Sequence, residues 1–546
     1  MDRRRFEGLM TRNADRRRLL LLGAAGVAAV SFAGRPTRLL AAQATPMASP
    51  GAETSGSFGG SPFTLGVASG DPLPDGVVLW TRLAPDPLHG GGMNGRGPVE
   101  VRWEIAADEG FGQVTTSGSA TATPELAHSV HVDVAGLEPG RDYFYRFLAG
   151  GELSPSGRTK TAPVAGAPLD RLRFAVTSCQ DWLTGQYTAY RHMAGDDLDF
   201  VLFLGDYIYE DAYGPDEATG TWRVPGREHT APEIVSLDDY RTRHALTKTD
   251  PHLQAAHAAF PWVATWDDHE VDNDYAGDRD EVGTPPEEFL LRRAAGYQAF
   301  YEHLPLRPES MPRGPAMQLY RRLTFGDLAE FTVLDTRQYR DDHPCGAGEQ
   351  VLCPAALDPA TTLLGPEQER WLLAGLDASN ARWNVLAQQI LMAELEHAAG
   401  SAEIFWTDAW DGYPAARNRI LGHVMSRGIA NPMVLTGDWH SSFVNDLKAD
   451  FRDDASLTVA TEFVVTAITT GGDDNGYDDY YGPMIANNPH IRFFDGDRRG
   501  FLRVDLTPDR WQTDLQMVDS VLDPNPGIST LASFVVESGQ PGAQPA

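Results

Sequence analysis

Five apolar runs in the sequence end in side chains that bind metals or transfer protons. The groups are a thiol, carboxylates, a phenol, imidazoles and an amide, and they stand at Cys179, at Asp206 with Tyr209, at Asp268 with His269, at Gln389, and at Asp438 with His440. A single carboxylate after a strand often caps the next helix, but five such endings are too many for that explanation. Buried carboxylates repel one another unless cations lie between them. The pattern therefore predicts a metal centre.

The runs that carry these side chains have the composition of buried strands. They are apolar and rich in β-branched residues, and helix-like stretches lie between them, for example at 285–305 and 365–379. Strands that are buried on both faces and alternate with helices indicate a layered α/β domain, which we assign to residues 170–520. Ligands of such domains gather at the carboxyl ends of the strands.

The segments on either side of this domain differ from it. Short alternating runs separated by Gly/Pro turns at 61–165 predict an N-terminal β-sandwich of the immunoglobulin or fibronectin type. Residues 45–60 are small, polar and rich in Gly and Pro, which is typical of a flexible linker. We expect residues 521–546 to form a C-terminal tail with one short helix near 528–536 and a frayed end.

The first 44 residues are predicted to be a targeting segment. Arginines at 16–18 precede an apolar, Gly/Ala-rich stretch at 19–33, and Ala44 ends a small-x-small cleavage pattern. The stretch is too short for a comfortable membrane span, and paired arginines before a mild apolar core favour the twin-arginine export route. An ordinary secretory signal and an uncleaved anchor are the alternatives. We expect the mature protein to be extracellular, periplasmic or cell-wall associated, without a transmembrane segment.

The chain of 546 residues is strongly acidic, with a formal net charge of −31. This charge argues against nucleic acid or an anionic membrane as the main partner. Among the three cysteines, Cys345 and Cys353 lie eight positions apart in a Gly-rich loop and are expected to pair outside the cytoplasm. The remaining Cys179 is either a packed, buried thiol or a metal ligand.

The order of the short motifs at the strand ends identifies a protein family more specifically than the positions of single residues do. Gly205-Asp206 is followed by a tyrosine three residues after the aspartate, then by Asp-His-Glu at 268–270, and then by Gly-x-x-His at 437–440. The segments that carry the pattern are FTLGVASGDPLPDGVVLWTRLAP, TSCQ, GDYIYE, WDDHEVDN, LDTRQYR, LAQQILM, TGDWH and NPHIRFFDGDRRGF. From about residue 60 to 535 the sequence resembles the PhoD-type alkaline phosphatase/phosphodiesterase branch of the calcineurin-like metallophosphoesterases. The resemblance implies a β-sandwich followed by a four-layer α/β/β/α catalytic domain, bound Fe³⁺ with one or two Ca²⁺, and phosphate mono- and diesters as substrates.

The resemblance also implies a set of iron ligands. Asp206 would bridge two metals, and Tyr209 would bind iron as a phenolate, which favours a hard trivalent ion. Cys179 departs from the wider superfamily, where the first strand supplies Asp-x-His, but it matches the PhoD branch, where a thiolate binds iron. His440 would complete the iron site.

A second set of residues would hold the other cation and the leaving group. Asp268 and Asp438 stand where the superfamily has Asn and His, and their harder oxygen ligands favour calcium or magnesium over zinc. Gln389, or its neighbour Gln388, is expected to touch the second metal. His269 would face the leaving group as a proton donor. Residues expected to support this set are Tyr207, Glu210, Asn273 and Gln180.

Other functions and roles stay open at this stage. Arg241, Arg243, Arg337 and Arg340 would either clamp phosphate or form surface salt bridges.

The main prediction is an exported phosphoesterase. The alternative is a protein that binds cell-wall polysaccharide or teichoic acid through the β-sandwich and carries a degenerate catalytic domain. A serine hydrolase is disfavoured because the sequence has no G-x-S-x-G motif.

Overall fold

The computed structural model describes residues 58, 60–211, 224, 226–229, 233–398, 403–473 and 475–546. The predicted signal segment, 1–44, and nearly all of the predicted linker, 45–60, lie outside the described residues. The described residues belong to one compact unit. Within the described ranges, no helix has both the length and the apolar character that crossing a bilayer requires.

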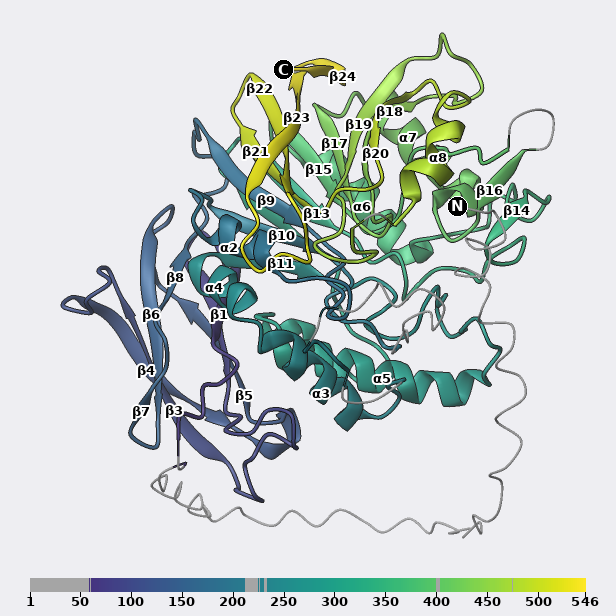
Figure 1. The fold of residues 1–546 in the computed structure, drawn as a ribbon. Coiled ribbons are helices and arrows are strands. Elements are labelled where there is room, and N and C mark those ends of the chain that lie inside the picture. The colour runs from purple at the N-terminus through teal and green to yellow at the C-terminus, as the bar shows by residue number, and fades with distance from the viewer. Residues whose placement is uncertain are drawn as a thin grey trace, which may run out of the picture. The chain divides into compact units, whose positions relative to one another are not determined.

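A ten-stranded sheet forms the larger half of the fold, and the three strands at its centre carry predicted site residues (Figure 1). Those strands are β9 (Leu172–Thr177), β10 (Phe200–Leu204) and β11 (Pro261–Thr265). They pair in parallel, and β10 and β11 are buried along their whole length. Parallel strands buried on both faces need continuous apolar sequence, which is why these runs could be recognised. The carboxyl ends of all three therefore meet at one edge of the sheet.

A second sheet of seven strands provides the other site-bearing strand. Its order is β12 (Arg321–Phe325), β13 (Ala329–Val333), β15 (Trp383–Ala387), β17 (Pro432–Thr436), β19 (Thr458–Val464), β18 (Ser442–Lys448) and β20 (Ile491–Asp495). Strands β13, β15, β17 and β19 are parallel. The two sheets share an apolar core that contains Phe174 and Leu202 from the larger sheet and Phe331 and Val385 from the smaller one.

Helices pack on the faces of the sheets that point away from this shared core. The buried cluster on the outer face of the ten-stranded sheet includes residues of α2 (Thr188–Ala194), α3 (Leu237–Lys248), α4 (Pro251–Ala259) and α5 (Pro286–His303). The cluster on the outer face of the seven-stranded sheet includes residues of α6 (Gly365–Ala378) and α7 (Pro414–Arg427). The helices predicted at 285–305 and 365–379 are thus present as α5 and α6, and the chain has a mixed α/β fold.

The N-terminal segment contributes to two sheets. Strands β1 (Val67–Leu73), β2 (Gly76–Arg82) and β5 (Ser129–Ala135) extend the ten-stranded sheet, because β1 pairs with β11. Strands β3 (Val99–Ala106), β4 (Val114–Ala122), β6 (Asp142–Ala149), β7 (Glu152–Leu153) and β8 (Gly157–Lys160) form a separate five-stranded sheet. Apolar residues of both groups, such as Leu79 and Tyr145, share one core. One layer of the N-terminal segment, formed by β1, β2 and β5, is therefore part of the ten-stranded sheet, and the other layer is the separate five-stranded sheet.

The C-terminal segment is a hairpin, so the helix predicted near 528–536 is wrong. Strands β21 (Gly500–Leu506), β22 (Arg510–Val518), β23 (Ile528–Glu537) and β24 (Gln540–Pro545) continue the ten-stranded sheet beyond β9. Phe534 and Val536 join the core between the sheets. Adjacent β-branched residues at 535–536 favour a strand, and β22 offers an edge with which this strand can pair.

A small two-stranded sheet consists of β14 (Glu349–Val351) and β16 (Ile404–Trp406). The Cys345–Cys353 disulfide closes the loop that contains β14, so this prediction is confirmed. A further helix, α8 (Tyr477–Ile485), follows β19 in the chain.

Candidate metal centre

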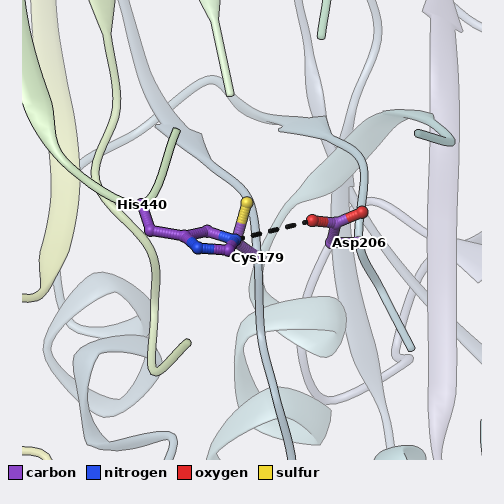
Figure 2. A group of neighbouring side chains, drawn as sticks. All are labelled: Cys179, Asp206 and His440. Atoms are coloured by element: carbon purple, nitrogen blue, oxygen red, sulfur yellow. Dashed lines mark ion pairs between the residues drawn. The ribbon is translucent and has the colours of Figure 1, made fainter. Parts of the chain in front are cut away.

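Predicted site residues from both sheets converge at the carboxyl ends of β9, β10, β11 and β17. They form three overlapping groups, and within each group one potential ligand atom per residue lies within 4.8 Å of the others. The groups are Cys179 with Asp206 and His440, Asp206 with Asp268 and His269, and Asp267 with Asp268 and Asp438. Figure 2 shows the first group, in which His440 Nε2 lies 3.9 Å from Asp206 Oδ2. Asp206 and Asp268 each belong to two groups and connect the three.

The backbone turns sharply at four of these residues. The φ angles are +58° at Cys179, +60° at Asp206, +60° at Asp438 and +54° at His440. Residues other than glycine rarely adopt this left-handed region, and each instance costs about 1–3 kcal/mol and persists only where the surroundings hold it. Cys179 N donates to Gly205 O at 3.0 Å, so the turns after β9 and β10 hold each other. These left-handed turns direct the side chains that follow β9, β10 and β17 toward the same site.

The phenol of Tyr209 lies inside the first group. Its Oη is 3.0 Å from Asp206 Oδ2 and 3.2 Å from His440 Nε2. Burial raises the pKa of both Tyr209 and Cys179 well above the ordinary range, and the charge of Asp206 adds to this effect. Neither group would ionise here without a cation to stabilise its anion. The structure thus brings all four predicted iron ligands together.

His269 is held by a buried carboxylate on the same side of the site. Its Nδ1 lies 2.7 Å from Glu210 Oε2, and the backbone N–H of Asn273 donates to Glu210 Oε1 at 3.0 Å. Burial opposes the charge on Glu210, yet His269 outweighs it and lowers the pKa of Glu210 to about 2. Burial alone would lower the pKa of His269, but Glu210 and the aspartates raise it well above its usual value. The two side chains form an ion pair that fixes the imidazole ring.

The third group surrounds a buried guanidinium. Arg337 Nε donates to Asp267 Oδ1, and its Nη1 donates to both oxygens of Asp408, at 2.9 and 2.7 Å. Its Nη2 lies 3.4 Å from Asp268 Oδ1 and 3.7 Å from Asp438 Oδ1. Arg337 is fully buried. It partly neutralises the acidic cluster from one side and orients two of its carboxylates.

Of the four arginines considered, Arg337, Arg340 and Arg243 are buried, whereas Arg241 pairs with the exposed Asp238. Arg340 is buried, and its Nη1 lies 2.9 Å from Asp408 Oδ1. Arg241 binds Glu302, whose side chain is buried, and Arg243 donates to the backbone carbonyls of Tyr209 and Asp211. The surface role is therefore wrong for Arg337, Arg340 and Arg243, and the phosphate-clamping role stays a prediction.

Three buried carboxylate oxygens lack hydrogen bonds in the described structure, and this shows whether the residues fit bound cations. Asp206 Oδ1, Asp267 Oδ2 and Asp268 Oδ1 are buried and accept no hydrogen bond in the part of the chain that is described. A buried, unsatisfied carboxylate oxygen is costly. Burial also raises the pKa of Asp267, Asp268 and Asp438, against the opposing charge of Arg337. A set of oxygen, sulfur and imidazole donors with unpaired buried oxygens fits multivalent cations.

The prediction for Gln389 needs correction. Its Oε1 accepts from the backbone N–H and the hydroxyl of Thr336, at 3.0 and 2.7 Å. Its Nε2 donates to Leu334 O at 2.9 Å and to Thr265 Oγ1 at 3.2 Å. The amide connects the ends of β11, β13 and β15 and has no capacity left for a metal. Its neighbour Gln388 is similarly bound to Ile390, Thr436 and Trp410.

The supporting residues act through the backbone. Gln180 Nε2 donates to the carbonyl of Tyr207 at 3.0 Å, and its Oε1 accepts from Tyr190. Glu270 accepts from the backbone N–H groups of Asp206, Tyr207 and Asp267, at 3.2, 2.6 and 2.8 Å. Glu270 therefore holds the turns after β10 and β11 together.

Three further residues, Asp267, Glu270 and Asp408, belong to the site but are not predicted from the sequence. Asp267 and Glu270 flank the predicted residues in WDDHE, so the motif itself contained the signal. Asp408 lies in a loop with no such motif, and only the fold brings it to Arg337.

Comparisons with known proteins identify the family of this chain. A family model described as PhoD-like phosphatase matches residues 174–515, and a second, described as the N-terminal domain of PhoD-like phosphatases, matches residues 48–163. The chain belongs to the PhoD-like phosphatase family. It is 52% identical over 488 residues to alkaline phosphatase D of Bacillus subtilis, covering 89% of this chain and 82% of that protein. A solved structure of PhoD superposes with a TM-score of 0.85 at 51% identity, covering 90% of this chain and 93% of the other. The protein is a phosphoesterase.

Proposed function

We propose that the protein is an exported, metal-dependent phosphoesterase that hydrolyses phosphate mono- and diesters. The observation that carries this proposal is the overlap of three ligand groups around shared, buried carboxylates, some of whose oxygens accept no hydrogen bond in the described structure. Family membership supports the reaction class, and the donor chemistry supports the metals.

Two cation sites follow from the grouping. Cys179, Asp206, Tyr209 and His440 would hold Fe³⁺, because a thiolate and a phenolate suit a trivalent ion. Asp206, Asp268 and Asp438 would hold Ca²⁺, with Asp267 as a further oxygen donor, because hard oxygen ligands suit calcium. When bound, such cations polarise phosphoryl oxygens and make a water molecule a stronger nucleophile.

His269 supplies the proton that the leaving oxygen needs. Glu210 occupies Nδ1 and holds it as the N–H nitrogen, so Nε2 is the atom that would meet the departing alkoxide. Proton donation by a positioned side chain typically contributes about 10²–10⁴-fold to the rate. Glu210 keeps the ring charged and aligned, and Glu270 keeps the two turns at a fixed separation.

The metals would also solve a charge problem. The chain carries a formal net charge of −31, and a phosphate ester is an anion that such a surface repels. The buried guanidinium of Arg337 does not supply enough positive charge to attract the substrate, because Asp267 and Asp408 already neutralise it. Bound multivalent ions would therefore supply the local positive potential that draws the substrate in.

The finer architecture and the export route belong to the same proposal. The apolar clusters between the sheets and under the helices support a four-layer α/β/β/α catalytic domain at 170–520. The core shared by β2, β5, β3 and β6 supports a β-sandwich at 61–165 that shares a sheet with it. Arginines at 16–18 and the apolar stretch at 19–33 support a twin-arginine signal at 1–44, followed by a linker at 45–60.

A purely binding function is the weaker candidate. A degenerate catalytic domain would have lost ligands, whereas Cys179, Asp206, Tyr209, Asp438 and His440 are all present and, with Asp268, meet in space. Chelation separates the two functions, because it should abolish hydrolysis and leave polysaccharide binding unchanged.

The decisive experiment joins spectroscopy with kinetics on one sample. Iron(III) phenolate absorbs visible light, so the purified protein should be coloured and should contain iron, and it should hydrolyse a chromogenic phosphodiester. Tyr209→Phe should bleach the colour. Tyr143→Phe is the matched control, since Tyr143 is a buried phenol of β6 that accepts from Glu138 N at 2.9 Å, and it should leave the colour intact. A folded wild-type protein that is colourless and free of iron would refute the assignment of Tyr209 and Cys179.

A further inference from the structure

The hydroxyl of Thr470 lies between two of the proposed iron ligands. Its Oγ1 is 2.7 Å from Tyr209 Oη and 2.8 Å from the backbone carbonyl of Cys179, and it accepts from Asp181 N at 3.2 Å. Thr470 is buried, with 8% of its surface exposed. This residue follows β19 and lies far along the chain from both ligands, so no sequence motif connects it to the site.

The segment around Thr470 is fixed to the loop after β9. Ile468 N donates to Ser178 O at 3.0 Å, and Thr469 Oγ1 donates to Asp181 O at 2.7 Å. Thr184 Oγ1 donates to Thr469 O at 2.8 Å. These bonds hold Oγ1 of Thr470 at a constant distance from the phenol.

A threonine hydroxyl has one hydrogen to donate, and Oγ1 has two acceptors within reach. The Cys179 carbonyl also accepts from Thr469 N at 3.4 Å and from Thr470 N at 3.3 Å. It therefore stays hydrogen-bonded when the Thr470 hydroxyl turns away. The hydroxyl can turn to the Tyr209 oxygen without leaving a buried acceptor unsatisfied.

The other polar atoms near Tyr209 Oη cannot take this role. Within the described structure these are Asp206 Oδ2 at 3.0 Å and His440 Nε2 at 3.2 Å. An ionised carboxylate only accepts hydrogen bonds, and an imidazole nitrogen that binds a metal carries no hydrogen. Thr470 is thus the donor available to the phenolate oxygen.

We propose that Thr470 is a positioning residue whose hydroxyl donates a hydrogen bond to the metal-bound oxygen of Tyr209 and so sets how strongly the phenolate donates electrons to iron. The inference rests on the proposed function, since it needs iron at Tyr209. A hydrogen bond to a phenolate oxygen stabilises its negative charge. Loss of that bond raises the energy of the phenolate electrons, so the charge-transfer absorption moves to longer wavelength and the ferric state becomes harder to reduce.

The test compares visible spectra and iron content of three variants with the wild type. Thr470→Val keeps the shape and removes the hydroxyl, and we expect it to bind iron with its absorption band shifted to longer wavelength. Thr470→Ser keeps the hydroxyl and should retain the wild-type band. Thr81→Val is the matched control, because it removes a buried threonine hydroxyl of β2 that donates to the backbone carbonyl of Gly66, outside the metal centre, and its band should not move.

Each outcome has a separate meaning. A wild-type band that Thr470→Val leaves unshifted at equal iron content overturns the inference and leaves the proposed function standing. A wild-type protein without iron and without a band overturns both. If Thr470→Val fails to fold, resonance Raman spectra of the wild type in H₂O and D₂O report on the same hydrogen bond to the phenolate oxygen. The phenolate vibrations should shift on deuteration, and their failure to do so contradicts the inference.

Discussion

Glu210 Oε2 and His269 Nδ1 lie 2.7 Å apart in the buried wall of the site, and both side chains are shielded from solvent. Their backbone positions come from different turns, after β10 and after β11. Asn273 N completes the arrangement by donating to the second oxygen of Glu210. The contact therefore ties the orientation of the imidazole to the two turns that carry Asp206 and Asp268.

Glu210→Gln should lower kcat and leave KM nearly unchanged. The amide keeps the shape of the side chain but no longer stabilises a charged imidazole, so the proposed proton donor, His269, is charged in a smaller fraction of molecules. We expect a loss on the order of tenfold, smaller than the loss of about 10²–10⁴-fold expected for His269→Ala. Steady-state kinetics on a chromogenic phosphodiester measure both constants.

Glu330→Gln is a suitable control for this variant. Glu330 is a largely buried glutamate of β13 that pairs with Arg322, outside the described metal centre, and its substitution should not change kcat. Wild-type kcat in Glu210→Gln would show that the ion pair does not assist the reaction.

Arg337→Met should destabilise the fold strongly. The substitution leaves Asp267 buried without its cation and removes one of the two arginines that pair with Asp408. Breaking a buried pair in this way costs about 3–5 kcal/mol. Thermal unfolding of the protein after chelation isolates this effect from metal binding. Arg427→Met, which removes an exposed pair with Asp377, should change the midpoint little. A midpoint for Arg337→Met no lower than that of this control would contradict the role assigned to Arg337.

The strand-end ligands could be predicted because parallel buried strands have a simple sequence pattern. Each apolar run ends where its sheet ends, so Cys179, Asp206, Asp268 and Asp438 had to lie near one another once the sheet was inferred. The left-handed turns that aim them had no such signal, because they occur at residues other than glycine.

The remaining parts of the site depend on contacts between distant segments. Arg337 and Asp408 come from separate loops, and Thr470 reaches Tyr209 across 261 positions of sequence. Gln389 stands at a strand end like the ligands, but neighbouring strands satisfy its amide. The segment near 528–536, predicted as a helix, is strand β23, because its pairing partner, β22, is visible only in the fold.

Removal of the Cys345–Cys353 disulfide should lower stability by about 2.5 kcal/mol, since the bond closes a loop of eight residues. The double variant Cys345→Ser with Cys353→Ser avoids a free reactive thiol. Thermal unfolding without reductant measures the loss, and addition of reductant to the wild type should reproduce it. A double variant as stable as the oxidised wild type would contradict this prediction.

Stability should fall as the pH drops from about 6.5 to about 4, in part because of His131. Burial lowers the pKa of His131 to about 4, although the carbonyls of Leu304 and Tyr301 accept from its ring at 3.0 and 2.8 Å. An unfolded histidine titrates near 6.5, so in this window the unfolded chain takes up a proton that the folded chain refuses. The free energy of unfolding then decreases by up to about 1.4 kcal/mol per pH unit for this group.

His131→Gln should reduce this pH dependence. The quantity to compare is the difference between unfolding midpoints at pH 7 and pH 5, because it cancels the general cost of the substitution. His89→Gln is the control, since His89 is exposed, with 81% of its side chain accessible. An unchanged difference in His131→Gln would exclude His131 as a source of acid sensitivity.

We propose that hydrolysis requires cations held by the converging carboxylates, thiol and phenol. The most direct measurement follows bound metal and phosphodiester turnover in the same sample as a chelator removes the ions and as they are added back. We predict that turnover falls in proportion to bound metal, vanishes in the metal-free protein and returns on reconstitution, but not in Asp206→Ala. A metal-free protein that retains the full rate would contradict the account.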